Sequence, residues 1–196
     1  GIPLVFFDRV LEEVATTKIT TNDYDSAYMA TTHLIKNGCK KILFLSFSDS
    51  LSISQKRLNG YKKALLENQL KFTDNNILSF NNDAKKDYLR LKKKLQSPRR
   101  PDAIVASVEK LALPVYQACE ELQFRIPDNV QVISFSNVDT AAFLNPPLTT
   151  ITQPAFEMGK AAAALLVKAL GRKNFELVNE EIIIDATLVF RKSTKG

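Results

Sequence analysis

The sequence has few of the residues that build disulfides and metal sites. It contains two cysteines, Cys39 and Cys119, and one histidine, His33, among 196 residues. Two cysteines without a CxxC spacing do not form a disulfide framework, so a reducing, cytoplasmic location is expected. A single histidine excludes most histidine-based metal sites. We therefore expect neither a metal nor a cofactor.

Enzyme motifs and membrane segments are also missing. There is no GxSxG nucleophile elbow and no Walker loop, and with six glycines in all there is no GxGxxG phosphate cradle. A nucleophilic serine or cysteine would have only His33 as a histidine base, and that residue lies in an apolar helical pattern. No apolar run approaches the roughly 20 residues that cross a bilayer. These absences argue against an enzyme and against a membrane protein.

The charge is basic but not concentrated. Lysine and arginine number 27 against 21 acidic residues, which gives a formal net charge of +6. An excess of positive charge is one signature of nucleic-acid binding. The basic residues are spread along the chain, however, and the densest group, residues 92–94 with Arg99 and Arg100, lies at the end of a predicted helix, where the helix dipole favours cations. We interpret this group as a solvated helix end.

Short apolar strands alternate with amphipathic helices along most of the chain. Hydrophobic residues make up 45% of the sequence and charged residues 24%, which is typical of a globular protein with a core. The alternation predicts βαβ units, and therefore an α/β fold with a parallel sheet and helices on both faces. The predicted strands are 41–47, 77–80, 103–106 and 130–135, and the predicted helices are 24–36, 54–68, 84–95 and 109–122.

The pattern changes after residue 135. We expect an extended segment at 148–152, a helix at 156–170 and two final strands at 181–184 and 187–190. Pro154 suits the first turn of that helix. The chain opens directly on strand-like residues without an initiating methionine, so the sequence looks truncated.

Six segments match the motifs of one protein family, in order and with few gaps. They are residues 2–9 (IPLVFFDR), 27–42 (AYMATTHLIKNGCKKI), 57–65 (RLNGYKKAL), 100–104 (RPDAI), 122–130 (LQFRIPDNV) and 147–154 (PLTTITQP). Together they resemble the lactose-repressor (LacI/GalR) family of bacterial transcription regulators. The resemblance covers essentially the whole chain, and the last two segments together are its most specific part.

The resemblance implies a type I periplasmic-binding-protein-like fold. In this fold two α/β subdomains are joined by three crossover segments, and a small molecule binds between them. The crossovers would lie near residues 19–22, 148–153 and 179–185.

The same resemblance implies one complete and one partial subdomain. Residues 22–148 and 181–196 would form the C-terminal subdomain, and residues 1–21 and 149–180 would form part of the N-terminal subdomain. In family members the first elements of the N-terminal subdomain, together with the DNA-binding headpiece, precede the segment that corresponds to this chain.

Two charged residues are the leading candidates for ligand contacts. The resemblance implies that Arg57 reaches from a helix start into the cleft, where its planar guanidinium would hold hydroxyl or carboxylate oxygens. Asp8 ends an apolar strand, so its carboxylate should emerge at the carboxyl edge of the sheet, where α/β proteins bind ligands. The alternatives are a surface arginine near a helix start and an aspartate that closes a turn towards Arg9. We expect Arg57 and Asp8 to approach the ligand from opposite subdomains.

Four further candidates depart from the family's pattern. Ser136 and Asn137 follow a strand where the family usually has GYDD or GFDN, whose first acid contacts the effector. Serine forms single hydrogen bonds but cannot bind bidentately, so the known sugar specificities do not transfer. Val108, followed by Glu109, replaces the common ND before a helix. Asn82 matches a position that is often aromatic, where an asparagine provides no stacking platform for a sugar or purine ring.

The function that the resemblance implies is effector sensing in a LacI-type transcription regulator. A sugar or related metabolite would shift the orientation of the subdomains. A homodimer, formed through helix 109–122 and the loop around Phe143 and Leu144, would transmit that shift to operator DNA through the missing headpieces. The alternative is a periplasmic sugar-binding protein of the same fold, and an enzyme on a Rossmann-like sheet ranks third.

Overall fold

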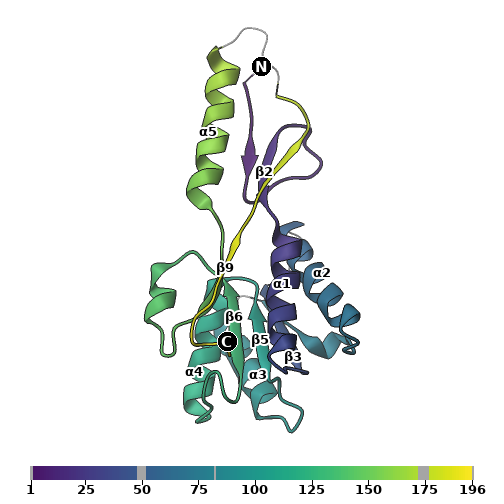
Figure 1. Ribbon diagram of the computed structural model, residues 1–196, viewed down its shortest axis with the longest axis vertical. Coiled ribbons are helices and arrows are strands. Elements are labelled where there is room, and N and C mark those ends of the chain that lie inside the picture. Colours follow the sequence, from purple (N-terminus) through teal and green to yellow (C-terminus); the bar gives the residue numbers. More distant parts are fainter. Residues whose placement is uncertain (1, 48–51, 82, 172–176, 196) are drawn as a thin grey trace.

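The protein contains two β-sheets, one above the other in Figure 1. The structure is a computed structural model that describes residues 2–47, 52–81, 83–171 and 177–195. Within these residues the lower sheet has six strands, in the spatial order β4 (Ile77–Phe80), β3 (Ile42–Phe47), β5 (Ala103–Ala106), β6 (Gln131–Phe135), β7 (Thr149–Thr152) and β9 (Thr187–Val189). The upper sheet has three strands, in the order β1 (Phe6–Phe7), β2 (Lys18–Thr21) and β8 (Glu181–Ile184).

The strands of both described sheets run parallel, apart from β9, which pairs antiparallel with β7. β4 and β5 have the bounds predicted from the sequence, and β3 and β6 each begin one residue later than predicted. The predicted α/β fold with a largely parallel sheet is therefore confirmed.

The described helices lie where the amphipathic patterns predicted them, with small differences at their ends. They are α1 (Asp23–Lys36), α2 (Ser52–Glu67), α3 (Ala84–Gln96), α4 (Ala112–Glu121) and α5 (Ala155–Gly171), together with the short 3-10 segments η1 (Asp74–Asn76), η2 (Glu109–Leu111) and η3 (Asp139–Phe143). The helix predicted at 109–122 is divided, because its first turn is the 3-10 segment η2. In the part of the chain that the structure describes, none of the helices combines the length and the apolar character needed to cross a membrane.

Helices cover both faces of the six-stranded sheet because its strands are apolar on both sides. Ile42 and Phe44 of β3 belong to one buried cluster, with side chains of α1 and α2. Leu43 and Leu45 of the same strand belong to a second cluster, with side chains of α3 and α4. Successive side chains of a strand point to opposite faces, so a continuous apolar run is what a sheet buried between two layers of helices requires.

The helix α5 packs on the three-stranded sheet. Met158 and Ala162 form a small buried cluster with Ile19 of β2. The opposite face of α5 leaves Phe156 and Leu170 exposed to solvent. Figure 1 shows α5 standing beside this sheet, away from the larger part of the molecule.

The described chain passes between the two sheets at three places. β2 leads to α1 through Asn22, β7 leads to α5 through Gln153, and β8 leads to β9 through Asp185. Each of these residues lies within one of the three segments in which a crossover was expected. Three crossovers mean that both sheets are assembled from segments far apart in the sequence.

The sheets divide the chain at other residues than the predicted subdomain boundaries. The prediction placed residues 149–180 with the N-terminal subdomain and residues 181–196 with the C-terminal one. In the structure β7 pairs with β6 in the six-stranded sheet, and β8 pairs with β2 in the three-stranded sheet. Strand pairing decides the sheet to which a segment belongs, so the two boundaries move to Gln153 and Asp185.

Candidate ligand-binding site

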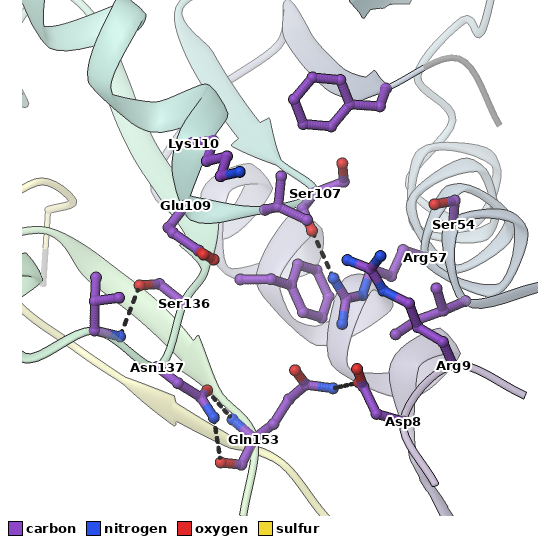
Figure 2. Close-up of a pocket in the computed structure, with 15 residues that line it drawn as sticks. Asp8, Arg9, Ser54, Arg57, Ser107, Glu109, Lys110, Ser136, Asn137 and Gln153 are labelled. Carbon is purple, nitrogen blue, oxygen red and sulfur yellow. Dashed lines mark hydrogen bonds between the residues drawn. The ribbon is translucent and has the colours of Figure 1, made fainter. Parts of the chain in front are cut away.

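A cavity of about 560 Å³ lies between the two sheets, at the carboxyl ends of the parallel strands. Its walls come from the segments that follow β1, β5, β6 and β7, from the end of β3, and from α2 (Figure 2). In α/β proteins ligands bind at this edge of a sheet, and the volume is that of a small-molecule site. We refer to it as the site cavity.

Arg57 lies in the wall of the site cavity, on α2, with only 4% of its surface exposed. Its Nε donates to Asp23 Oδ1 at 2.6 Å, and its Nη1 donates to the carbonyl oxygen of Ser107 at 2.6 Å. The guanidinium carbon stands 3.8 Å from the centre of the Phe135 ring. Among the described residues the other terminal nitrogen, Nη2, has no hydrogen-bond partner.

Acidic neighbours stabilise the positive charge of Arg57. Burial lowers the pKa of Arg57, while Asp23 and, more weakly, Asp8 and Glu109 raise it again. An arginine guanidinium stays protonated throughout the ordinary pH range. The site cavity therefore contains a fixed positive group with a defined orientation.

Asp8 approaches the site cavity from the three-stranded sheet, directly after β1. Its backbone has a φ of 63°, in the left-handed region that aspartate tolerates better than most residues. The carboxylate Oδ1 accepts a long hydrogen bond of 3.5 Å from Gln153 Nε2. Figure 2 shows Asp8 and Arg57 on different segments of the chain, and both are in the wall of this cavity.

The other predicted residues that the structure describes also line this cavity. Ser136, Asn137 and Val108 are part of its wall. The hydroxyl of Ser136 accepts a hydrogen bond of 3.3 Å from the backbone N–H of Val138. Asn82 lies outside the described residues. The structure thus brings together five of the predicted residues, although ligand binding by each of them stays a prediction.

Sequence reasoning missed Gln153, which lies at the middle crossover and lines the site cavity. Its backbone is held by Asn137, whose Oδ1 accepts from Gln153 N at 2.7 Å and whose Nδ2 donates to Gln153 O at 2.9 Å. Its side chain donates to Thr21 Oγ1 at 3.0 Å. Gln153 belongs to the PLTTITQP segment, which was identified in the sequence as a family motif without this glutamine being assigned to the site.

The lining offers hydrogen-bond donors, acceptors and aromatic faces together. Besides Arg57, two more cationic side chains line the cavity, those of Arg9 and Lys110, and Glu109 contributes a carboxylate. The rings of Phe47 and Phe135 are also part of the lining. Rings provide an apolar surface, and the charged groups suit a ligand with several hydroxyl or carbonyl groups. Among the described residues, no three histidine, cysteine or acidic side chains gather as metal ligands would.

Comparison with known proteins defines the class of this chain. Residues 31–194 match the periplasmic binding protein-like domain family, so the chain belongs to that family. More particularly, it corresponds to the effector-binding domain of LacI-type regulators, as its relatives show.

Two curated relatives illustrate the match. The HTH-type transcriptional repressor PurR of Photobacterium profundum is 32% identical over 194 residues, which is 99% of this chain and 58% of that protein. The ribose operon repressor of Haemophilus influenzae is 31% identical over 193 residues, which is 98% of this chain and 58% of that protein. The chain therefore spans less than two thirds of the length of these repressors.

Solved structures of transcription regulators have the same fold as this chain. A LacI family regulator from Enterococcus faecium with bound ribose superimposes with a TM-score of 0.85 at 26% identity, over 98% of this chain and 70% of that one. The regulator CcpA of Lactococcus lactis has the same TM-score, identity and coverage. All of these relatives are named as regulators rather than as enzymes.

Proposed function

We propose that this chain is the small-molecule-sensing part of a LacI-type transcription regulator, and that a sugar or related polar metabolite binds in the site cavity. One observation carries the proposal: Arg57 and Asp8 belong to parts of the chain attached to different sheets, and both line one cavity. A ligand that contacts both favours one orientation of the sheets. It shifts the orientation only as far as it binds one arrangement more tightly than the other.

In the whole protein this shift would alter operator binding. The relatives are named as repressors, and we infer that DNA is contacted by a headpiece outside this chain. The basic side chains here are dispersed, whereas specific DNA recognition requires side chains that reach base edges. We further infer a homodimer in the cytoplasm, since a dimer gives the two headpieces a common geometry.

A periplasmic sugar-binding protein of the same fold is the second candidate. It is favoured only by the fold, while the named repressors favour the regulator. The N-terminal coding region of the full gene separates the two, because a regulator carries a helix–turn–helix motif and a periplasmic protein carries a signal peptide.

A ligand screen tests the proposed function directly. The full-length protein is heated with a panel of sugars, sugar phosphates and nucleobases, and its unfolding temperature is recorded. A ligand at one hundred times its dissociation constant stabilises the folded state by about 2.7 kcal/mol. If no compound of these classes raises the unfolding temperature, the proposed function is wrong.

Arg57→Lys is the matched variant for the compound that binds. Lysine keeps a cation beside Asp23 but has no planar fork, so the contact through Nη2 is lost. We expect affinity for the compound to fall by about tenfold or more, with operator affinity retained. The control is Arg125→Lys, at a side chain that is 80% exposed, and it should bind as the wild type does. Unchanged affinity in Arg57→Lys would remove Arg57 from the site.

A further inference from the structure

We propose that Thr21 and Asp23 are positioning residues that couple the crossovers to the guanidinium of Arg57. The proposal depends on the proposed function only in taking Arg57 as the group that meets the ligand. Both residues lie outside the lining of the site cavity, and neither was singled out from the sequence.

A chain of hydrogen bonds runs from the middle crossover to Arg57. Gln153 Nε2 donates to Thr21 Oγ1 at 3.0 Å, and Thr21 Oγ1 donates to Asp23 Oδ2 at 2.8 Å. Arg57 Nε donates to the other carboxylate oxygen, Asp23 Oδ1, at 2.6 Å. A threonine hydroxyl has one proton and can also accept, so Thr21 fits this place with both capacities in use. We call Gln153, Thr21, Asp23 and Arg57 the hinge relay.

Burial makes the hinge relay sensitive to the loss of Thr21, Asp23 or Arg57. Thr21 and Asp23 are each 3% exposed, and Arg57 is 4% exposed. Water has little access to replace a missing partner, and a buried polar group left unpaired is costly. Such a network responds as a unit more than as separate pairs.

The hinge relay spans two separate crossovers. Thr21 ends β2 at the first crossover, and Gln153 follows β7 at the second. The third crossover is joined to the first by Asn22, whose Oδ1 accepts a hydrogen bond of 2.8 Å from the backbone N–H of Ala186. A rotation of one sheet against the other changes the distance between the first and second crossovers. It therefore lengthens or shortens the hydrogen bond between Gln153 and Thr21.

The position of Arg57 follows from this arrangement. Asp23 stands at the first turn of α1, just past the crossover, and holds Nε of Arg57, while Ser107 O holds Nη1. If Thr21 releases Asp23, the carboxylate gains freedom and the guanidinium loses one of its two fixed points. By linkage, a ligand that fixes Arg57 also favours the hinge arrangement in which the relay is complete.

The first experiment uses nitrogen-15 NMR to measure how fast the Nε proton of Arg57 exchanges with solvent, in the full chain without ligand. Its signal is assigned by its absence in Arg57→Lys. We expect Thr21→Val, which removes only the hydroxyl, to speed exchange of this proton with solvent by about tenfold. The control is Thr31→Val, because Thr31 is also a buried threonine near the start of the chain, and its hydroxyl donates to Ala27 O within α1 at 2.8 Å. That variant should leave the exchange rate unchanged.

The second experiment measures how widely the separation of the two sheets varies. Spin labels are attached at Glu120→Cys on α4 and Ala164→Cys on α5, two exposed positions on helices that pack on different sheets. We expect a narrow distribution of label separations in the parent protein, at least doubled in width by Thr21→Val and unchanged by Thr31→Val. Both labelled variants are first checked for cooperative unfolding.

The outcomes are decisive. If Thr21→Val leaves either the exchange rate of the Arg57 Nε proton or the width of the label distribution unchanged, or if Thr31→Val alters both as much as Thr21→Val does, the proposed coupling is overturned. Neither measurement uses a ligand, so a failed ligand screen with an intact hinge relay would refute the proposed function alone. A successful screen with an unchanged Arg57 proton would refute the coupling alone.

Discussion

At the scale of single residues, Arg57 combines the enclosure of a core side chain with access to the site cavity. Asp23 and Ser107 hold two of its nitrogens, and the Phe135 ring lies against its guanidinium. The side chain is therefore ordered before any ligand arrives. A preorganised group binds with a smaller loss of conformational entropy than a flexible one, which suits a sensor whose response depends on small differences in binding free energy.

The two thiols give a test of native packing. Burial raises the pKa of Cys39 to about 12 and that of Cys119 to about 11, and only the thiolate is strongly nucleophilic. At pH 8 both groups are almost fully protonated as well as buried. We expect a chromogenic disulfide reagent to modify neither thiol within minutes in the folded protein and both in denaturant. Fast modification of one thiol in the folded state would show that its surroundings open locally.

The sequence predicted some site residues better than others, for a physical reason. Asp8 was found because a polar residue at the end of an apolar strand is visible locally. Asp23 was not found, because an acidic residue at the start of a predicted helix is adequately explained by the helix dipole. Its partner, Arg57, lies on another helix, and only the tertiary structure brings the two together. Gln153 is uncharged, so its side chain gave no electrostatic reason to place it in the site.

At the scale of elements, the contact between α1 and α2 depends on Gly60. A Cβ at this position would lie 2.0 Å from the backbone oxygen of Tyr24, so the two helices would have to separate. We expect Gly60→Ala to lower the free energy of unfolding by about 1–3 kcal/mol, measured by urea denaturation. Because Gly60 is close to Arg57 on α2, the same variant should weaken ligand binding.

Gly159→Ala is the control for this prediction. Gly159 lies within α5, and a Cβ there would meet nothing within 4 Å. Alanine is favoured over glycine inside a helix by roughly 0.5–1 kcal/mol, so this substitution should stabilise the protein. Equal effects of the two substitutions would contradict the close packing of α1 on α2.

Element positions were predictable from periodicity, whereas sheet membership was not. Strands such as β4 and β5 are apolar runs bounded by helical patterns, and their limits follow from the local sequence. β7 and β8 have equally clear extended patterns, but their partners are β6 and β2, and β2 lies at the other end of the chain from β8. The local sequence contains no information on that choice.

At the scale of the whole molecule, one surface is suited to self-association. Phe143 of η3 is 84% exposed and Leu113 of α4 is 57% exposed. Tyr116 Oη donates to Pro146 O at 2.8 Å, which ties the segment after η3 to α4. We expect Phe143→Glu to convert a dimer to a monomer in sedimentation velocity at micromolar concentration, since a charge at the centre of an apolar contact is unfavourable.

The control is Leu66→Glu on α2, at a side chain that is 72% exposed. It introduces the same charge on a different helix and should leave the dimer intact. A monomeric parent protein, or dissociation by both substitutions, would rule out this surface.

The pairing of β2 with β8 also sets an order for biosynthesis. Lys18 is in register with Glu181 and Thr21 with Ile184, so β2 cannot acquire its second neighbour until the ribosome has translated residues 181–184. β3, β4, β5 and β6 are all synthesised by residue 135, and they can assemble while the remainder is still being translated. During that interval β2 carries an unpaired edge, which is a template for wrong pairing. β2 is therefore shielded later than these four strands of the six-stranded sheet, and its open edge stays accessible to chaperones and proteases until β8 has been translated.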